Sequence, residues 1–195
     1  SLHAALPISA AAIVGYTNAG KSTLLNKLTG SAVYAADELF ATLDPTSRRL
    51  RFPEEREVVL IDTVGFIRDL PDTLVSAFRA TLEELSDADL LLHVVDGSDA
   101  RRRQQMEAVD NVLATLELSA TPRITVLNKS DRVERRGAPL AGRAGDSDGE
   151  AERLRAVRTS AVTGAGLDDL VARMKQELWS EGRRWPGEAT PVAAQ

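Results

Sequence analysis

The sequence predicts an α/β fold in which a six-stranded, mostly parallel sheet carries helices on both faces. Short runs of Ala, Val, Leu and Ile alternate along the chain with segments whose apolar residues recur at helical spacing, which is the pattern of a doubly wound sheet. One of these runs is followed directly by a glycine-rich turn, another by Asp62 and another by Asn128. The 195 residues fall within the size of one core, so we expect one domain.

Six short runs are the candidate strands. They are Ala10–Val14, Arg48–Phe52, Glu57–Ile61, Leu90–Val95, Ile124–Leu127 and Ala156–Thr159. Only Pro53–Arg56 separates the second run from the third, which predicts a hairpin and therefore one antiparallel edge strand. The other runs alternate with helical segments, which predicts parallel neighbours.

Four segments place apolar residues on one helical face. The marker residues are Leu24, Leu25 and Leu28; Leu74, Phe78, Leu82 and Leu85; Met106, Val109, Leu113 and Leu116; and Leu167, Leu170, Val171, Met174 and Leu178. Residues 31–47 lack a regular period and contain Asp44-Pro45, which indicates a functional loop. We interpret 133–150, rich in Gly, Ala, Arg and Asp, as a mobile surface insertion.

The composition excludes several classes of function. The absence of cysteine excludes disulfides and cysteine-ligated zinc, and the two histidines, His3 and His93, are too few for a histidine cluster. His93 lies inside a hydrophobic run, so we expect a packed core residue. A net charge of −5 argues against binding nucleic acid through bulk charge. No apolar run is long enough to cross a membrane, and we expect a soluble, cytoplasmic monomer.

The turn after the first run has the spacing of a phosphate-binding loop, Gly-x4-Gly-Lys-Ser. Its glycines allow backbone N–H groups to point at phosphates, and the following helix N-terminus adds partial positive charge. Lys21 is the candidate contact to the β- and γ-phosphates, and the Ser22 hydroxyl is the candidate Mg²⁺ ligand. The predicted phosphate-binding residues are Gly15, Tyr16, Thr17, Asn18, Ala19, Gly20, Lys21, Ser22 and Thr23.

A second motif, Asp62-Thr63-Val64-Gly65, stands at the end of another hydrophobic run. There the Asp62 carboxylate would hold Mg²⁺ through a water, and the Gly65 N–H would sense the γ-phosphate. The motif is common in ordinary turns. Its place after the phosphate loop is what favours the functional interpretation.

A third motif, Asn128-Lys129-Ser130-Asp131, follows the fifth run and predicts guanine recognition. The Asp131 carboxylate would accept hydrogen bonds from N1–H and the 2-amino group, while the Lys129 stem would lie along the ring. Adenine has no N1–H and would leave that carboxylate unpaired, which costs about 1–3 kcal/mol. After the last run, a backbone N–H of Ser160 or Ala161 is the candidate donor to guanine O6.

Taken together, these motifs resemble the HflX family of GTPases, which are described as ribosome-splitting or 50S-associated. The segments that carry the resemblance are Tyr16–Thr23, Ala36–Thr46, Asp62–Pro71 and Leu91–Asp96. The resemblance covers about residues 10–181. It implies a Ras-like P-loop fold, GTP as substrate, Mg²⁺ as cofactor, and as partners GTP or GDP and the large ribosomal subunit (50S) with its rRNA.

The resemblance also implies roles for single residues. Thr42 would be the switch threonine that closes on Mg²⁺, and it would act in hydrolysis together with Lys21 and Gly65. The residues expected to line the nucleotide in that switch are Phe40, Ala41, Thr42, Leu43 and Asp44. Some related GTPases use the residue at the position of Asn18 to ligate potassium, which makes K⁺ a second candidate cation.

Phe66 follows the switch glycine, where Ras-like enzymes carry a glutamine that orients the attacking water. Phenylalanine has no donor or acceptor for that water, so we expect slow intrinsic hydrolysis that the ribosome stimulates. The resemblance implies association with the large subunit, splitting, or rescue of stalled ribosomes. Two alternatives stay open: a GTPase module of another ribosome-assembly or tRNA-modification factor, and a nucleotide-binding switch without enzymatic activity.

We expect the G domain of this family to occupy residues 9–181 and a polar tail to occupy 182–195. Residues 5–8 read Ala-Leu-Pro-Ile, which resembles a translated sequencing adaptor, so we hypothesise that 1–8 are not native. The resemblance also implies an N-terminal region, with a separate domain and a helical segment important for ribosome contact, that is missing from this sequence. We therefore expect this chain to be a fragment.

Overall fold

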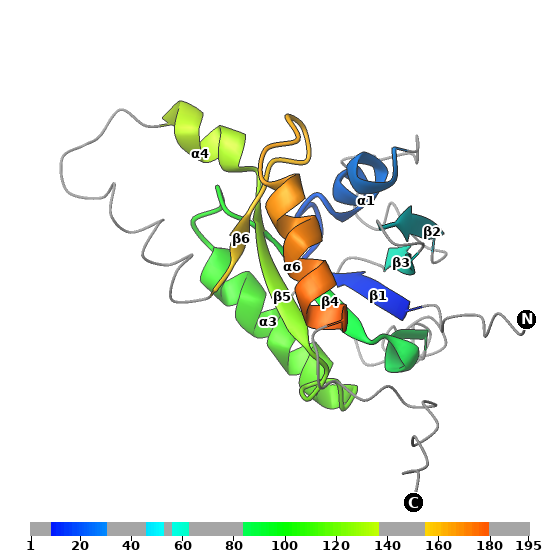
Figure 1. The fold of residues 1–195 in the computed structure, drawn as a ribbon. Helices are drawn as coiled ribbons and strands as arrows, with labels where there is room; N and C mark the ends of the chain where they lie inside the picture. Colours follow the sequence, from blue (N-terminus) through cyan, green and yellow to red (C-terminus); the bar gives the residue numbers. More distant parts are fainter. Residues whose placement is uncertain (1–8, 31–45, 53–55, 63–83, 137–154, 180–195) are drawn as a thin grey trace, which may run out of the picture.

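The computed structural model describes residues 9–30, 46–52, 56–62, 84–136 and 155–179. Its centre is a six-stranded sheet with the strand order β2-β3-β1-β4-β5-β6 (Figure 1). The strands are β1 Ser9–Val14, β2 Thr46–Arg51, β3 Glu57–Asp62, β4 Leu90–Asp96, β5 Arg123–Asn128 and β6 Val157–Arg158. Each strand lies within about two residues of its predicted position.

Only the edge strand β2 runs antiparallel to its neighbour, β3; the other neighbouring strands pair in parallel. This confirms the predicted hairpin and the mostly parallel sheet. Parallel strands covered on both faces consist of apolar residues almost throughout, because both sets of alternating side chains are buried. Strand β4 is the clearest case, since the side chains from Leu90 to Val95 are all buried.

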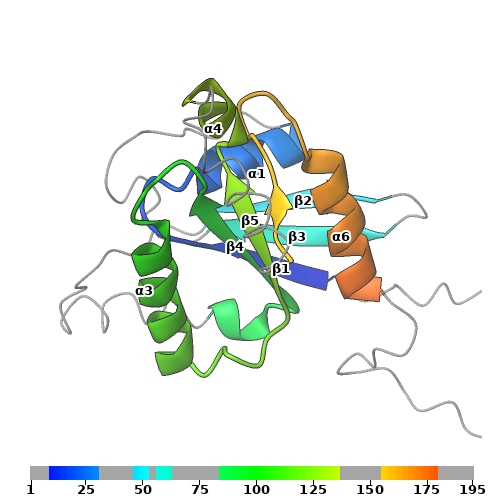
Figure 2. The same cartoon turned by 90° about the vertical axis from the view of Figure 1, so that its left-hand side faces the viewer.

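Helices cover both faces of the sheet, with α3 Arg102–Thr115 on one side and α6 Leu167–Trp179 on the other (Figure 2). Helix α1 Lys21–Thr29 shares the core of α6, where Leu25 and Met174 pack with Ile13 and Leu92. The opposite core joins side chains of α3 to the alternate residues of β1 and β4, and it includes Ala12, Val14, Leu91, Val109 and Leu113. These layers confirm the predicted α/β class.

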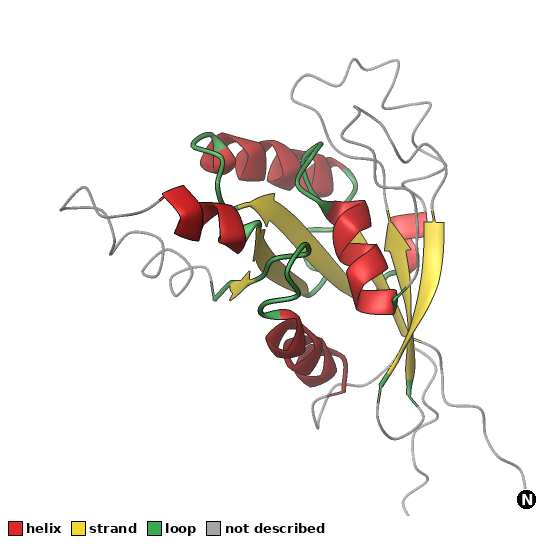
Figure 3. Ribbon diagram, turned by 90° about the horizontal axis from the view of Figure 1, so that it is seen from above, coloured by secondary structure: helices red, strands yellow, loops and turns green. Residues whose placement is uncertain are grey.

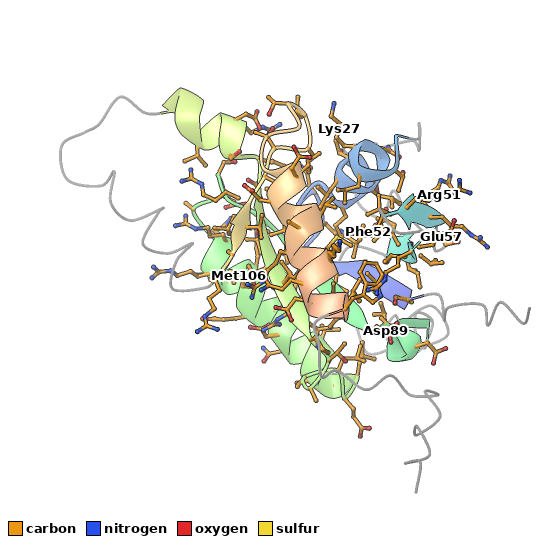
Figure 4. All side chains as sticks on the ribbon, viewed as in Figure 1. Lys27, Arg51, Phe52, Glu57, Asp89 and Met106 are labelled. Carbon is orange, nitrogen blue, oxygen red and sulfur yellow. The ribbon has the colours of Figure 1, made fainter. Side chains whose placement is uncertain are left out.

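An aromatic contact fastens the β2–β3 hairpin to the end of α6. The Phe52 and Trp179 rings meet edge to face with centroids 4.9 Å apart, and the Arg56 guanidinium lies 5.2 Å from the Trp179 ring centroid. Figure 4 shows Phe52 beside α6 and the neighbouring pair Arg51 and Glu57 at the outer edge of the sheet. Contacts of this kind stabilise the fold by about 0.5–1.5 kcal/mol beyond the effect of burying apolar area.

Two expectations need correction. Residues from Val133 to Arg136 belong to a helix, α4 Ser130–Arg136, and not to an insertion, because the chain continues helically from the end of β5. Leu85 is buried as expected but lies in a short 3₁₀ turn, η1 Glu84–Asp87. The expected helix marked by Leu74, Phe78 and Leu82 lies outside the described residues, as do residues 137–150 of the proposed insertion.

His93 is packed inside β4, as predicted, with only 2% of its surface exposed. Burial and, to a lesser extent, the charge of Arg123 lower the pKa of its imidazole to about 4, although the charge of Asp110 acts in the opposite direction. The side chain is therefore a neutral core residue at neutral pH. Among the residues that the structure describes, no helix has the length and apolar character needed to cross a membrane.

Candidate functional site

The three predicted motifs meet at the carboxyl ends of the parallel strands, where β1 lies between β3 and β4. Ligands of doubly wound sheets bind at this edge, beside the point where the strand order reverses. Figure 3 shows the molecule from above, with the helices around the sheet. Hydrogen bonds of Asn128, at the end of β5, join the segments that follow β1 and β6. The sequence therefore brings residues separated by more than a hundred positions into one site.

Two positions of the phosphate loop require glycine, because the loop backbone there lies very close to atoms at the ends of neighbouring strands. A Cβ on Gly15 would lie 2.2 Å from the backbone oxygen of Val94. Gly20 has a φ of +93°, and a Cβ there would lie 2.4 Å from Asn128 Nδ2. Glycine is needed at both positions, and at Gly20 the left-handed backbone is a second reason.

Helix α1 begins at Lys21, directly after Gly20, and no side chain caps its N-terminus. Lys21 is 7% exposed, and its ammonium donates to the backbone oxygens of Gly15 at 3.3 Å and Tyr16 at 3.2 Å. Burial lowers the pKa of Lys21 to about 8, although the charge of Asp62 pulls in the other direction. The loop thus holds a buried cation against carbonyl groups, which is a setting that an anionic ligand would stabilise.

The end of β3 meets the start of α1 through two oxygen-bearing side chains. The Ser22 hydroxyl donates to Asp62 Oδ2 at 2.7 Å, and Asp62 is completely buried. Hydroxyl and carboxylate oxygens suit Mg²⁺, which uses one or two protein ligands together with phosphate oxygens and water. The described residues include no group of three His, Cys, Asp or Glu side chains that could hold a metal alone. The donor set therefore fits a magnesium ion bound with a nucleotide.

The guanine motif is joined to the phosphate loop and to the last strand through one buried amide. Asn128 Nδ2 donates to the backbone oxygen of Ala19 at 3.0 Å. Its Oδ1 accepts from the Ala161 N–H at 3.0 Å and from the Thr159 hydroxyl at 3.4 Å. Because Asn128 is 1% exposed, these hydrogen bonds fix the relative position of all three segments.

Asp131 stands at the first turn of α4, where the Ser160 hydroxyl donates to its Oδ1 at 2.7 Å. The Ser160 N–H donates to the backbone oxygen of Ala165 at 2.9 Å, and the Ala161 N–H donates to Asn128. Both amides predicted as donors to guanine O6 therefore already have acceptors within the protein. A contact with O6 would have to share or replace one of these hydrogen bonds.

Lys129 lies between the phosphate loop and the end of β4. Its ammonium donates to the backbone oxygen of Asn18 at 2.7 Å and is 2.8 Å from Asp96 Oδ2. Asp96 also accepts from the N–H and hydroxyl of Ser98, at 2.9 and 2.6 Å. Burial raises the pKa of Asp96, but the hydrogen bonds from Lys129 and Ser98 outweigh this and hold it below the usual value.

The structure brings together every predicted site residue that it describes, whereas the switch segments lie outside the described residues. Those outside are Phe40, Ala41, Thr42, Leu43, Asp44, Thr63, Val64, Gly65 and Phe66. Asp96 was not among the predicted site residues. The available signal was its position: it ends a buried run and, in the parallel register, lies opposite Asn128.

Comparison with known proteins agrees with this geometry. A protein family described as "50S ribosome-binding GTPase" matches residues 10–129. GTPase HflX of Magnetococcus marinus is 48% identical over 173 residues, covering 89% of this chain and 38% of that protein. GTPase HflX of Escherichia coli is also 48% identical, over 87% of this chain and 38% of that protein. The chain thus spans about 38% of the length of these curated relatives.

Solved structures give the same fold. A variant of Aquifex aeolicus Era, crystallised with GDP·AlF4⁻, is 26% identical and superposes with a TM-score of 0.71, covering 94% of this chain and 61% of that one. The G domain of the Thermotoga maritima FeoB iron transporter, 21% identical, has a TM-score of 0.61 over 89% of this chain and its own full length. The chain therefore belongs to the 50S ribosome-binding GTPase family, has a Ras-like P-loop fold and is similar to GTPase HflX over most of its length.

Proposed function

We propose that this chain is the nucleotide-dependent switch of an HflX-type protein that acts on the large ribosomal subunit in the cytoplasm. The observation that carries the nucleotide part is the junction at Asn128, which ties the phosphate loop to the guanine motif and to the segment after β6. The family description and the names of the relatives support the ribosomal part.

In this proposal the phosphates of GTP lie at the N-terminus of α1. Lys21 and the N–H groups at the start of the helix stabilise the negative charge of the phosphoryl oxygens and of the leaving GDP. Ser22 and Asp62 would hold Mg²⁺, Asp62 through a water, and the ion would supply positive charge that neutralises the β- and γ-phosphates. Era, crystallised with MgGDPNP and a segment of 16S rRNA, is a structural neighbour with that ligand chemistry.

Selectivity for guanine comes from Asp131, which Ser160 orients, and from the stem of Lys129. The carboxylate pairs with N1–H and the 2-amino group, whereas adenine would leave it unpaired. We expect Asp131→Asn to weaken GTP binding by about 10- to 100-fold, because the charge that receives two hydrogen bonds is lost. The phosphate contacts of Lys21 are untouched by this change.

Hydrolysis in this proposal is slow without a partner, because Phe66 cannot orient the attacking water. The switch residues Thr42 and Gly65 would complete the site beside Mg²⁺ and the γ-phosphate when GTP is bound. We expect Phe66→Gln to raise the unstimulated rate of phosphate release. An unchanged rate in this variant, or rapid unstimulated turnover by the parent, would count against this role of Phe66.

Asn18 is the proposed potassium ligand beside the phosphates. Its backbone oxygen already accepts from Lys129, so its side chain is the group that we propose for the ion. Phosphate release measured in matched potassium and sodium chloride buffers tests this role directly. Equal rates in the two buffers would remove potassium from the mechanism.

The first experiment is phosphate release from GTP and from ATP, with and without purified large ribosomal subunits. It uses this chain and a longer protein that includes the residues encoded upstream in its natural gene, with Asp131→Asn as the matched control. GTP-selective turnover that large subunits stimulate supports the proposal. GTP turnover that no ribosomal subunit stimulates, in either protein, retains the nucleotide site and refutes the ribosomal function.

A further inference from the structure

Lys129, the lysine of the guanine motif, is held in place by a carboxylate that belongs to neither the phosphate loop nor the guanine motif. Asp96 ends β4, lies opposite Asn128 in the parallel register, and contacts the Lys129 ammonium at 2.8 Å. Its neighbour Gly97 donates its N–H to the Asn128 oxygen at 2.9 Å. The β4–β5 ladder therefore fixes the distance between Asp96 and Lys129.

We propose that Asp96 is a positioning residue for guanine nucleotides, which locks the Lys129 side chain across the phosphate loop in the arrangement that receives the base. This inference rests on the proposed function, because it assigns a new residue to the same nucleotide site. Asp96 acts through Lys129 and needs no contact with the nucleotide.

Both partners of this ion pair are largely removed from solvent, with side-chain exposures of 15% for Asp96 and 12% for Lys129. A pair on the open surface contributes little, but this one is shielded and its carboxylate is itself held by two hydrogen bonds from Ser98. A lysine side chain has many rotamers, and fixing one of them before the ligand arrives reduces the entropy lost on binding.

The backbone conformation of Lys129 and Asn18 also supports this positioning role. Lys129 and Asn18, which meet through the 2.7 Å hydrogen bond, have φ values of +62° and +58°. Non-glycine residues seldom adopt this conformation, and it persists where surrounding contacts impose it. The ion pair with Asp96 is one such contact, so it connects base recognition to the path of the phosphate loop.

The test is a double-mutant cycle on the affinity and dissociation rate of fluorescent GDP. We expect Asp96→Asn to weaken GDP binding by about tenfold, mainly through faster dissociation, since one charge-assisted hydrogen bond to Lys129 is lost. Lys129→Ala should weaken binding at least as much. Because Asp96 acts only through Lys129, the double variant should bind no more weakly than Lys129→Ala alone.

Asp99→Asn is the matched control. Asp99 lies in the same loop and accepts from the Arg101 N–H and from Gln105 Nε2, both at 2.8 Å, at the start of α3. Its loss should leave GDP affinity within about twofold of the parent, although it removes the same charge. If Asp96→Asn fails to fold, as judged by circular dichroism, Ser98→Ala replaces it with an expected weakening of about threefold.

The outcomes separate this inference from the proposed function. GDP binding by Asp96→Asn within about twofold of the parent, or effects of Asp96→Asn and Lys129→Ala that simply add, overturns the inference and leaves the GTPase function intact. A parent protein that binds no guanine nucleotide overturns both. A loss of about tenfold that disappears in the Lys129→Ala background establishes Asp96 as the positioning residue.

Discussion

The guanine end and the phosphate end of the site differ in how the protein satisfies its polar groups. At the guanine end, Asn128 and Asp131 are already engaged by the backbone or side chains of other segments. At the phosphate end, Lys21 is also buried, yet its ammonium donates to two carbonyl oxygens of its own loop, and burial lowers its pKa.

This difference indicates that the guanine end contributes to both nucleotide affinity and fold stability, whereas the phosphate end contributes to affinity alone. The guanine end is preorganised by hydrogen bonds that also hold the fold together, so substitutions there should lower stability and affinity at once. The phosphate end carries a charge that costs the fold free energy, so substitutions there should lower affinity and leave stability unchanged or higher.

The largest expected effect is on Lys21. Lys21→Met should weaken GDP binding by at least about 100-fold, because a charge-assisted contact to the phosphates contributes about 1.5–3 kcal/mol and the β-phosphate receives more than one hydrogen bond. The same variant should unfold at an unchanged or higher temperature without nucleotide. Calorimetric titration with GDP and thermal unfolding measure the two effects.

A clear fall in the unfolding temperature of nucleotide-free Lys21→Met would contradict the proposed difference between the two ends of the site. It would mean that the hydrogen bonds to Gly15 and Tyr16 stabilise the fold by more than the burial of the charge costs. Lys27→Met is the control, because Lys27 lies on the exposed face of the same helix and should change neither quantity.

Asn128→Ala should give the opposite pattern in stability. Truncation leaves the Ala19 oxygen and the Ala161 N–H without their buried partner, which costs about 2–3 kcal/mol. For a domain of this size that lowers the unfolding temperature by roughly 4–10 °C even without nucleotide. GDP affinity should fall by about tenfold or more. Thermal unfolding that matches the parent would show that the guanine end is not part of the stabilising framework.

The pH dependence of nucleotide binding should identify the phosphate end. The pKa of Lys21 is about 8, below its ordinary value of 10.5, so the nucleotide-free protein loses this proton as the pH rises through about 8. Phosphates need the charged form, and GDP affinity should therefore fall by about tenfold between about pH 7 and about pH 9. The stability of the nucleotide-free protein should rise from about pH 8 towards 10.5, because the unfolded chain then binds more protons.

Lys21→Arg provides the control for this titration, because a guanidinium stays protonated throughout the range. Its GDP affinity should be lower than that of the parent but independent of pH over this range. A pH dependence that persists in Lys21→Arg would assign the titration to another group.

The sequence was sufficient to predict the fold because its signals were local. Apolar runs and helical spacing indicated the strands, the antiparallel edge and the helices around Leu25, Val109 and Met174. The corrections arose where the signal was weak: α4 carries no apolar stripe, and its helix follows from the turn after β5. Composition alone could not distinguish Val133–Arg136 from the residues beyond.

The site was predictable as far as each motif is contiguous in sequence. Spacing identified Lys21, Asp62 and Asn128, because a loop at a strand end binds ligands through neighbouring residues. Asp96 was not found, since its partner Lys129 follows another strand and only the register of β4 and β5 brings them together. The hydrogen bond from Ser160 to Asp131 is a similar long-range pairing that no local pattern predicts.

The smallest expected effect concerns the hydrogen bond from Ser160 to Asp131 at the guanine end. Ser160→Ala removes the hydroxyl that donates to Asp131 and accepts from the Thr163 N–H, so the carboxylate should lose part of its orientation. We expect GDP affinity to fall by about fivefold, which corresponds to about 1 kcal/mol. Thr163→Ala in the same loop removes only an exposed hydrogen bond from the Ala165 N–H at 3.3 Å, so it should change GDP affinity by less than about twofold. This substitution affects the contacts to the base and not those to the phosphates. Because inosine lacks the 2-amino group, Ser160→Ala should weaken the binding of inosine diphosphate less than the binding of GDP. Equal losses for both nucleotides would place the effect of Ser160 outside base recognition.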